Sequence, residues 1–245
     1  MNKYDSSSFI NDLKKLTIEI TNKQQEQFIK YYELLNRWNA VMNLTAITEF
    51  NEVMKKHFID SVSLIKALPD MKEKQYTIID VGTGAGFPGI PLKITFPQVR
   101  VVLLDSLNKR VSFLNEVINN LELTNIEALH GRAEDLAKKK EYRENFDICV
   151  SRAVANLTTL SEYCIPFVKI GGYFISYKSE KITEEYKDAG EAVKVLGGKY
   201  KEQIEFNLPD SDIYRNLFII EKIKNTPGKF PRKAGLPSKE PIKKR

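Results

Sequence analysis

The sequence lacks the patterns that would assign it to several large classes of protein. Its 245 residues include two cysteines, Cys149 and Cys164, and no CxxC motif or Cys/His cluster. A disulfide scaffold and a metal site are therefore not expected. No apolar run approaches the ~20 residues needed to span a bilayer, and the first residues, MNKYDSSSF, lack the apolar core of a secretory signal. We expect a soluble cytoplasmic protein without membrane contacts.

The net charge of +6 is confined to one end of the chain. Residues 225–245, here called the basic tail, carry seven basic residues and one acid, whereas residues 1–224 carry 31 of each sign. Such a Pro-containing basic segment indicates contact with a polyanion, and a solvated segment without a partner is the equal alternative. The charged residues of the tail are Lys229, Arg232, Lys233, Lys239, Glu240, Lys243, Lys244 and Arg245.

Residues 1–68 predict a helical extension that packs on the remainder of the fold. Thr21 and Gln24 have the spacing of a capping box. Aromatic and aliphatic residues then recur at the helical spacing that is typical of core packing. The segment 43–48 interrupts this pattern, and a further helix is predicted from residue 49 to residue 68. The recurring residues are Phe28, Tyr31, Leu35 and Trp38.

Residues 69–224 alternate between strand-like and helical segments. This order predicts a parallel sheet covered by helices on both faces. The last two strands are too close in sequence for a helical crossover, so they are expected to be antiparallel. We predict a Rossmann-like α/β domain with a seven-stranded, mostly parallel sheet and an antiparallel last strand. Strands are expected at 77–80, 99–105, 125–130, 146–152, 173–178, 200–206 and 216–223, and helices at 89–95, 109–121, 157–168 and 183–196.

The segment TIIDVGTGAGFPGIP, residues 77–91, is the most informative part of the chain. A β-branched strand ends at Asp80, and Gly82, Gly84 and Gly86 follow at every second position. Glycine permits a sharp turn and the close approach of a ligand to the backbone. A strand, a glycine-rich turn and a helix in this order can cradle a nucleotide-like cofactor. A tight turn without a ligand is the simpler alternative.

Polar residues also follow the other predicted strands. Asp105 ends the second strand, 19 residues beyond Gly86, where an acid can accept hydrogen bonds from ribose hydroxyls. Glu134 follows the third strand as a possible partner for adenine or ribose, and Ser151 and Arg152 end the fourth. Each residue alone could be an ordinary surface group. Because ligands of open α/β sheets bind where such strand ends meet, the set together predicts a cofactor site.

Two cofactors compete for this geometry. Dinucleotide enzymes usually have the spacing GxGxxG with a diphosphate at the helix N-terminus, whereas this loop has GxGxG directly after Asp80. A carboxylate would repel a diphosphate and attract the ammonium of a methionine moiety, which favours S-adenosylmethionine over NAD. An NAD-dependent oxidoreductase and a non-enzymatic RNA-binding module that uses the basic tail remain the alternatives.

Several longer motifs carry a resemblance to one bacterial family. The chain contains DVGTGAGFPGIPL, LLDSLNKRVSFL, GRAED, SRAVANL, RWNAVMNLTAIT, KHFIDS and FPRKAGLPSKEP. Together they resemble the 16S ribosomal RNA guanine-N7 methyltransferase family, from about residue 25 to residue 241. The resemblance implies a class I S-adenosylmethionine-dependent methyltransferase that acts on the conserved 530 hairpin loop of 16S ribosomal RNA. It also implies cofactor contacts at Gly82, Phe87, Ala133, Glu134 and Arg152, to which the glycine loop and second strand add Gly84 and Asp105.

Methylation at guanine N7 is consistent with the absence of an amine-methylation motif from the sequence. The fourth strand carries no DPPY- or NPPY-like motif of the kind found in amine-methylating enzymes. N7 is a lone-pair acceptor on the major-groove edge and carries no proton to remove, so proximity and orientation suffice. We therefore expect no catalytic general base. The expected partner is 16S ribosomal RNA, in the small subunit or its assembly precursor, with Arg232 and Lys233 contacting RNA.

Overall fold

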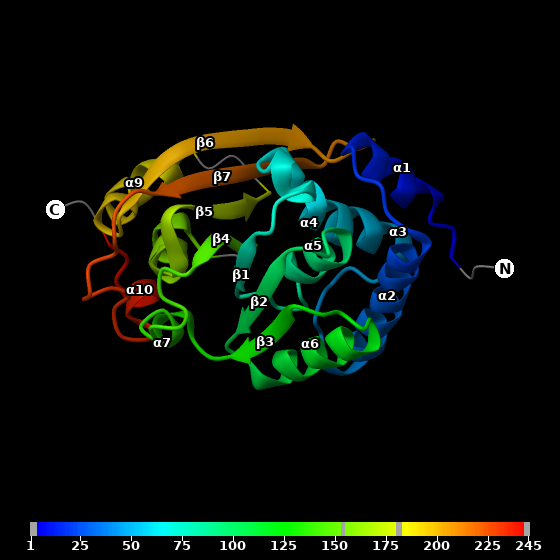
Figure 1. The fold of residues 1–245 in the computed structure, drawn as a ribbon, viewed down its shortest axis with the longest axis horizontal. Helices are drawn as coiled ribbons and strands as arrows, with labels where there is room; N and C mark the ends of the chain where they lie inside the picture. Colours follow the sequence, from blue (N-terminus) through cyan, green and yellow to red (C-terminus); the bar gives the residue numbers. More distant parts are fainter. Residues whose placement is uncertain (1–3, 153–154, 180–182, 243–245) are drawn as a thin grey trace.

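The computed structural model describes residues 4–152, 155–179 and 183–242 and contains one seven-stranded sheet (Figure 1). The strand order is β3-β2-β1-β4-β5-β7-β6, and the order reverses between β1 and β4. Strands β1 to β5 pair in parallel, whereas β7 is antiparallel to both β5 and β6. The predicted fold class is confirmed. The strands are β1 (Thr77–Val81), β2 (Arg100–Asp105), β3 (Ile126–His130), β4 (Phe146–Ser151), β5 (Val168–Lys178), β6 (Gly198–Asn207) and β7 (Tyr214–Lys222).

Two layers of buried side chains lie on the two faces of the sheet. The central strands are buried on both faces, as expected of parallel strands covered by helices. Ile78 packs on one face, together with α2 (Asn22–Met42), α5 (Gly89–Thr95) and α6 (Asn108–Asn120). Ile79 packs on the other, together with α7 (Ala133–Leu136), α8 (Leu157–Cys164) and α9 (Thr183–Val195). Cys149 and Cys164 are free thiols buried in this second layer.

The N-terminal helices differ in part from the sequence prediction. Helix α1 (Ser7–Lys15) precedes α2, whose capping box between Thr21 and Gln24 is confirmed. The helix predicted at 49–68 is found as a continuous helical segment from residue 50 to residue 66, but this segment changes its winding several times. It comprises α3 (Phe50–Val53), the π-helix η1 (Met54–Ile59), α4 (Asp60–Val62) and the 3-10 helix η2 (Ser63–Lys66), with the 3-10 helix η3 (Pro69–Lys72) following. π-Helical turns are rare and are frequently found at functional sites.

Two further boundaries differ for local reasons. Helix α8 ends at Cys164 rather than near residue 168, because Pro166 in the 3-10 helix η4 (Ile165–Phe167) has no N–H for a continuing helix. Strand β5 consequently begins at Val168, five residues before its predicted start at residue 173. Nearer the C-terminus, α10 (Leu236–Lys239) packs against α8.

The N-terminal helices and the segment after β7 lie on opposite sides of the molecule (Figure 1). Helices α1 to α3 cover one side, and the segment after β7 turns back along α7 and α8 on the other. Within the described ranges, none of the helices combines the length and apolar character that crossing a bilayer requires. Strands β1 to β5 end on one edge of the sheet, here called the carboxyl edge.

Candidate cofactor site at the carboxyl edge

The three alternating glycines of the loop after β1 have different roles. Gly82, Gly84 and Gly86 have φ values of 72°, 63° and 94°, a region that other residues rarely adopt. A Cβ on Gly84 would meet no described atom within 4 Å, so this glycine faces open space. A Cβ on Gly86 would lie 2.5 Å from Ile90 Cδ1 and 2.7 Å from the Tyr31 hydroxyl. Gly84 therefore leaves room for a ligand, whereas Gly86 leaves room for helix α2.

Asp80 is a fully buried carboxylate beneath this loop. One oxygen, Oδ2, accepts hydrogen bonds from the Thr83 hydroxyl (2.6 Å) and the Gly89 N–H (2.9 Å). The other oxygen, Oδ1, is buried and has no hydrogen-bond partner within the described part of the chain. Burial raises the pKa of Asp80 to about 6, although the two hydrogen bonds and Arg152 oppose the shift. An unpaired buried carboxylate oxygen is suited to a cationic ligand group.

Asp105 ends β2 and fastens the glycine loop. Its Oδ2 accepts the Gly84 N–H (2.9 Å), and its Oδ1 accepts the Leu107 N–H (2.9 Å) just before α6. The Arg110 guanidinium lies 3.4 Å from Oδ2. The structure thus gives this carboxylate, which is 2% exposed, a definite role in loop geometry. A carboxylate has about four acceptor positions, so the ribose contact stays a prediction.

A cavity of about 360 Å³ lies beside the glycine loop. Gly82 lines it from the loop, and Ala133 and Glu134 line it from the start of α7. Tyr163 of α8 and Gly235 of the basic tail are among the other residues that line it. Three of the residues predicted to bind the cofactor therefore border one cavity, and the tail supplies part of its wall.

Two carboxylates of the α/β domain, those of Glu134 and Glu162, bind the basic tail near this cavity. The Gly235 N–H donates to Glu134 Oε1 at 2.8 Å. Arg232, for which the sequence predicts an RNA contact, binds Glu162 of α8 through its guanidinium, with Nη2 2.7 Å from Oε2. Glu162 is buried, so Arg232 neutralises a charge inside the fold and is not a free cation. Lys233, the neighbouring predicted contact, is exposed.

Arg152 lies on the other face of the carboxyl edge, just after β4. Its Nη1 donates to Asp60 Oδ2 at 2.8 Å, and its guanidinium lies over the Phe87 ring, 4.9 Å from the centroid. Asp60 Oδ1 also accepts from Arg215 Nε at 2.7 Å. This buried carboxylate is therefore held between two arginines from β7 and the end of β4. The predicted residues Phe87 and Arg152 come together here, beside rather than inside the 360 Å³ cavity.

His57 of the π-helix belongs to the same group. Its Nδ1 lies 3.3 Å from Arg152 Nη2, and its Nε2 lies 2.8 Å from Thr45 Oγ1. Because arginine can only donate, Nδ1 is the acceptor and Nε2 carries the proton. Burial, with Arg152 next in importance, lowers the pKa of His57 to about 3. The neutral ring stacks on Phe87 at 4.6 Å and 20°.

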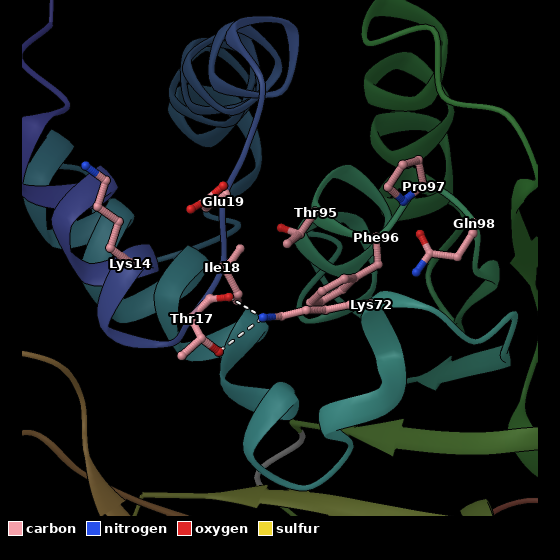
Figure 2. A pocket seen from close by; sticks show the side chains of 9 residues that line it. All are labelled: Lys14, Thr17, Ile18, Glu19, Lys72, Thr95, Phe96, Pro97 and Gln98. Carbon is pink, nitrogen blue, oxygen red and sulfur yellow. Dashed lines mark hydrogen bonds between the residues drawn. The ribbon is translucent and has the colours of Figure 1, made fainter.

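A second cavity lies away from these residues. It has a volume of about 670 Å³, and residues before β1 and β2 line it together with the end of α1 (Figure 2). Its lining includes Thr17, Lys72 and Phe96, and Lys72 Nζ donates to the backbone and hydroxyl oxygens of Thr17 (Figure 2). It contains none of the predicted site residues. The described residues also include no group of three or more His, Cys, Asp or Glu side chains placed to hold a metal.

Several residues of the site were not identified from the sequence. Tyr31 of α2 donates its hydroxyl to the Ala85 carbonyl and so holds the glycine loop. Asp60 and Glu162 are the buried partners of the two predicted arginines. The acidic residue in KHFIDS was a usable signal for Asp60, whereas Glu162 lies in a helix with no motif. Within SRAVANL, residues 153–154 lie outside the described residues, as do residues 243–245 of the tail.

The residues present fit S-adenosylmethionine. The open side of Gly84 allows a close backbone approach, and Asp80 offers an unpaired buried oxygen to a cation. Three acids, Asp80, Asp105 and Glu134, surround the loop and cavity. Such a set favours a cofactor with ammonium and sulfonium charges over one with a diphosphate.

Solved structures of low sequence identity share the fold. The YcgJ protein from Bacillus subtilis is 14% identical and aligns with a TM-score of 0.52, covering 69% of this chain and 100% of that one. A SAM-dependent methyltransferase from Aquifex aeolicus is 19% identical and aligns with a TM-score of 0.50, covering 71% and 94%. These likenesses establish the architecture of the sheet and its helices.

Sequence relatives are much closer. The ribosomal RNA small subunit methyltransferase G of Lachnoclostridium phytofermentans is 56% identical over 238 residues, covering 97% of this chain and 98% of the relative. The protein of the same name from Clostridium tetani is 54% identical over 216 residues, covering 88% and 90%. The model of the rRNA small subunit methyltransferase G family matches residues 24–214. The chain therefore belongs to the rRNA small subunit methyltransferase G family.

Proposed function

We propose that this protein transfers the methyl group of S-adenosylmethionine to N7 of a guanine in the 530 hairpin loop of 16S ribosomal RNA. Family membership supports the methyl transfer and the RNA substrate, and it removes the reason for the two alternatives, an NAD-dependent oxidoreductase and a non-enzymatic RNA-binding module. The observation that carries the proposal is the unpaired, buried Oδ1 of Asp80, directly before a loop whose Gly84 faces open space. A cationic, nucleoside-like cofactor satisfies both.

The cofactor is proposed to lie along the carboxyl edge of the sheet. In this arrangement Asp80 faces the ammonium of the methionine moiety. Gly82 and Gly84 border the part of the cofactor that connects this moiety to the adenosine. The adenosine occupies the 360 Å³ cavity between Gly82 and Glu134. Asp105 contacts the ribose. Of the remaining predicted contacts, Ala133 is proposed to lie at the adenosine end of the cofactor and Phe87 at the methionine end. Arg152 lies over the Phe87 ring.

The reaction is proposed to need no general base. When bound, S-adenosylmethionine supplies an electrophilic methyl group on a sulfonium. The guanine N7 lone pair is free of a proton, so the task of the chain is to align the two reactants and exclude water. His57 supports this assignment, because its low pKa and its contact with Arg152 leave its basic nitrogen occupied.

The regions of the chain have distinct proposed roles. Residues 69–224 form the methyltransferase domain, and residues 1–68 brace its glycine loop through Tyr31. Residues 225–245 contact RNA through exposed lysines such as Lys233. The partner is the small ribosomal subunit or its assembly precursor, and the reaction is placed in the cytoplasm, where that particle is assembled.

Methyl transfer to defined RNA tests this proposal. Labelled S-adenosylmethionine is supplied with the protein and with naked 16S RNA, an assembly precursor or the finished subunit. The modified residue is then mapped by mass spectrometry. We expect one 7-methylguanosine in the 530 loop in at least one of these forms. A methyl group on an exocyclic amine or on another base would contradict the choice of acceptor atom.

Ligand binding gives an independent check of the cofactor. A ligand that binds only the native state raises its apparent stability. S-adenosylhomocysteine is expected to raise the melting temperature, and NAD at the same concentration is not. The reverse order would remove the basis for a methyltransferase.

A further inference from the structure

The basic tail is anchored to the fold along much of its described length. The Thr226 N–H donates to Glu144 Oε1 at 2.6 Å, and Arg143 donates to the carbonyl oxygens of Thr226 (2.6 Å) and Phe230 (2.8 Å). Farther along, the Thr159 hydroxyl lies 3.3 Å from the Pro237 carbonyl oxygen. Residues 226–240 therefore form a strap across the molecule, which we call the C-terminal strap.

The centre of the C-terminal strap is a buried ion pair. The side chain of Glu162, 1% exposed, accepts from the Arg232 backbone N–H at 2.8 Å and from its Nε at 2.9 Å. It also accepts from Arg232 Nη2 at 2.7 Å. Both the backbone and the guanidinium of one residue are thus fixed on one carboxylate. Such paired, charge-assisted bonds impose position as well as contributing energy.

Three residues later, the strap enters the cofactor cavity. Gly235 has a φ of 82°, and its N–H points to Glu134 Oε1 at 2.8 Å. Gly235 and Glu134 both line the cavity of about 360 Å³. Since Glu134 is 5% exposed, few orientations are open to its carboxylate, and the Gly235 N–H selects one of them. The second oxygen of Glu134 can then accept a hydrogen bond from a ligand.

We propose that Arg232 and Glu162 are positioning residues for cofactor binding. Their ion pair holds residues 232–235 so that the Gly235 N–H fixes Glu134 in the pocket. This inference rests on the proposed function, because it assigns the cavity to the adenosine of S-adenosylmethionine. It reassigns Arg232 from an RNA contact to the cofactor site, although Arg232 acts there without touching the ligand.

Neighbouring substitutions separate the two roles. Arg232→Met removes the ion pair, and Lys233→Met removes an exposed cation of the same tail. Arg232→Met is expected to weaken S-adenosylhomocysteine binding about tenfold, the loss expected from one hydrogen bond to a charged group. The salt dependence of RNA binding should be unchanged in this variant. Lys233→Met is expected to show the opposite pattern.

A double-mutant cycle tests whether the effect passes through Glu134. In a Glu134→Ala protein, adding Arg232→Met should change the affinity for S-adenosylhomocysteine less than about twofold, because the positioned group is already absent. A merely structural role would give additive losses. Glu162→Gln, which retains one acceptor oxygen, replaces Arg232→Met if the latter does not fold, and Arg232→Lys should restore part of the affinity.

The outcomes are distinguishable from failure of the proposed function. If the unmodified protein does not bind S-adenosylhomocysteine, the proposed function itself is wrong. If it binds but Arg232→Met and Glu162→Gln bind equally well, the positioning role is overturned. Additive losses in the cycle, or a reduced salt slope in Arg232→Met, would also overturn it.

Discussion

The N-terminal extension and the C-terminal strap contact opposite faces of the α/β domain near the carboxyl edge and build similar ion pairs there. On one face, Asp60 of the N-terminal extension binds Arg152 after β4. On the other, Arg232 of the C-terminal strap binds Glu162 of α8. In each pair a buried carboxylate fixes an arginine, and one member lies outside the alternating β/α units. The N-terminal extension and the C-terminal strap therefore complete the candidate site.

The two pairs differ in what they hold in place. Asp60 of α4 also binds Arg215 of β7, and Arg152 after β4 lies over Phe87 of the glycine loop, so this pair joins four parts of the fold by side chains. The Arg232 pair instead fixes a backbone segment, which then presents one N–H to Glu134. We therefore expect the N-terminal pair to govern the position of the loop and the C-terminal pair to govern the adenosine end of the cavity.

Removing the strap should give the largest effect. Truncation after Asn225 leaves Glu162 buried without Arg232 and exposes the surface under Phe230. Removing one partner of a buried ion pair costs about 3–5 kcal/mol, so we expect a loss of at least ~4 kcal/mol in the free energy of unfolding. Urea denaturation measures this loss. An unchanged midpoint and slope would mean that the tail is a detached RNA-binding segment.

Asp60→Ala is the matching change on the other face. It leaves Arg152 and Arg215 facing each other without their carboxylate, at side-chain exposures of 18% and 16%. We expect a loss of about 3 kcal/mol in the free energy of unfolding, somewhat less than for truncation, because both arginines retain access to water. The affinity for S-adenosylhomocysteine should fall as well. Asp210→Ala, at an exposed ion pair with Lys15, is the control and should have little effect on either quantity.

Substitutions at two glycines of the loop separate its contact with Tyr31 of the N-terminal extension from its contact with the ligand. Gly86→Ala places a Cβ 2.7 Å from the Tyr31 hydroxyl and should destabilise the fold by about 2 kcal/mol through overpacking and an unfavourable φ. Gly84→Ala meets open space, so only the backbone strain of about 1 kcal/mol is expected. Its main effect should be weaker binding of S-adenosylhomocysteine. Equal affinity in Gly84→Ala and the unmodified protein would show that the open face is not the ligand site.

Asp80, whose carboxylate accepts the Gly89 N–H at the start of α5, should set a pH dependence. Its pKa is raised from 3.8 to about 6 in the folded protein, so its contribution to the stability of the ligand-free protein falls as the pH rises through that interval. Binding of a cationic group requires the ionised form. Cofactor affinity should therefore fall as the pH drops below about 6, approaching tenfold per unit.

Calorimetry with S-adenosylhomocysteine between pH 4.5 and pH 8 gives this profile, with roughly half-unit steps sufficient to resolve one titration. In Asp80→Asn the affinity should be lower and nearly independent of pH over this range. An identical slope in both proteins would assign the titration to another group.

The sequence predicted the sheet and the glycine loop because both depend on local patterns. Strand residues such as Ile78 and Ile79 alternate between two buried layers, and the three glycines, for which a sharp turn was predicted, have positive φ values. The π-helix at 54–59 could not be predicted, because one extra residue per turn leaves no periodic signal in six residues. The partners of the two arginines could not be predicted either, because they are distant in sequence. Asp60 lies 92 residues from Arg152, and Glu162 lies 70 residues from Arg232.

Lys233→Met should have the smallest effect on stability, and it contrasts an exposed cation of the strap with its paired neighbour Arg232. Its ammonium is exposed, so its removal should not change the free energy of unfolding by more than about 0.5 kcal/mol. If Lys233 contacts one RNA phosphate, the slope of log affinity against log salt should decrease in magnitude by about 0.7–0.9. Fluorescence anisotropy with a 530-loop RNA at several salt concentrations measures this slope. An unchanged slope, together with a normal response in a variant of the exposed Lys239, would move the RNA contact farther along the tail.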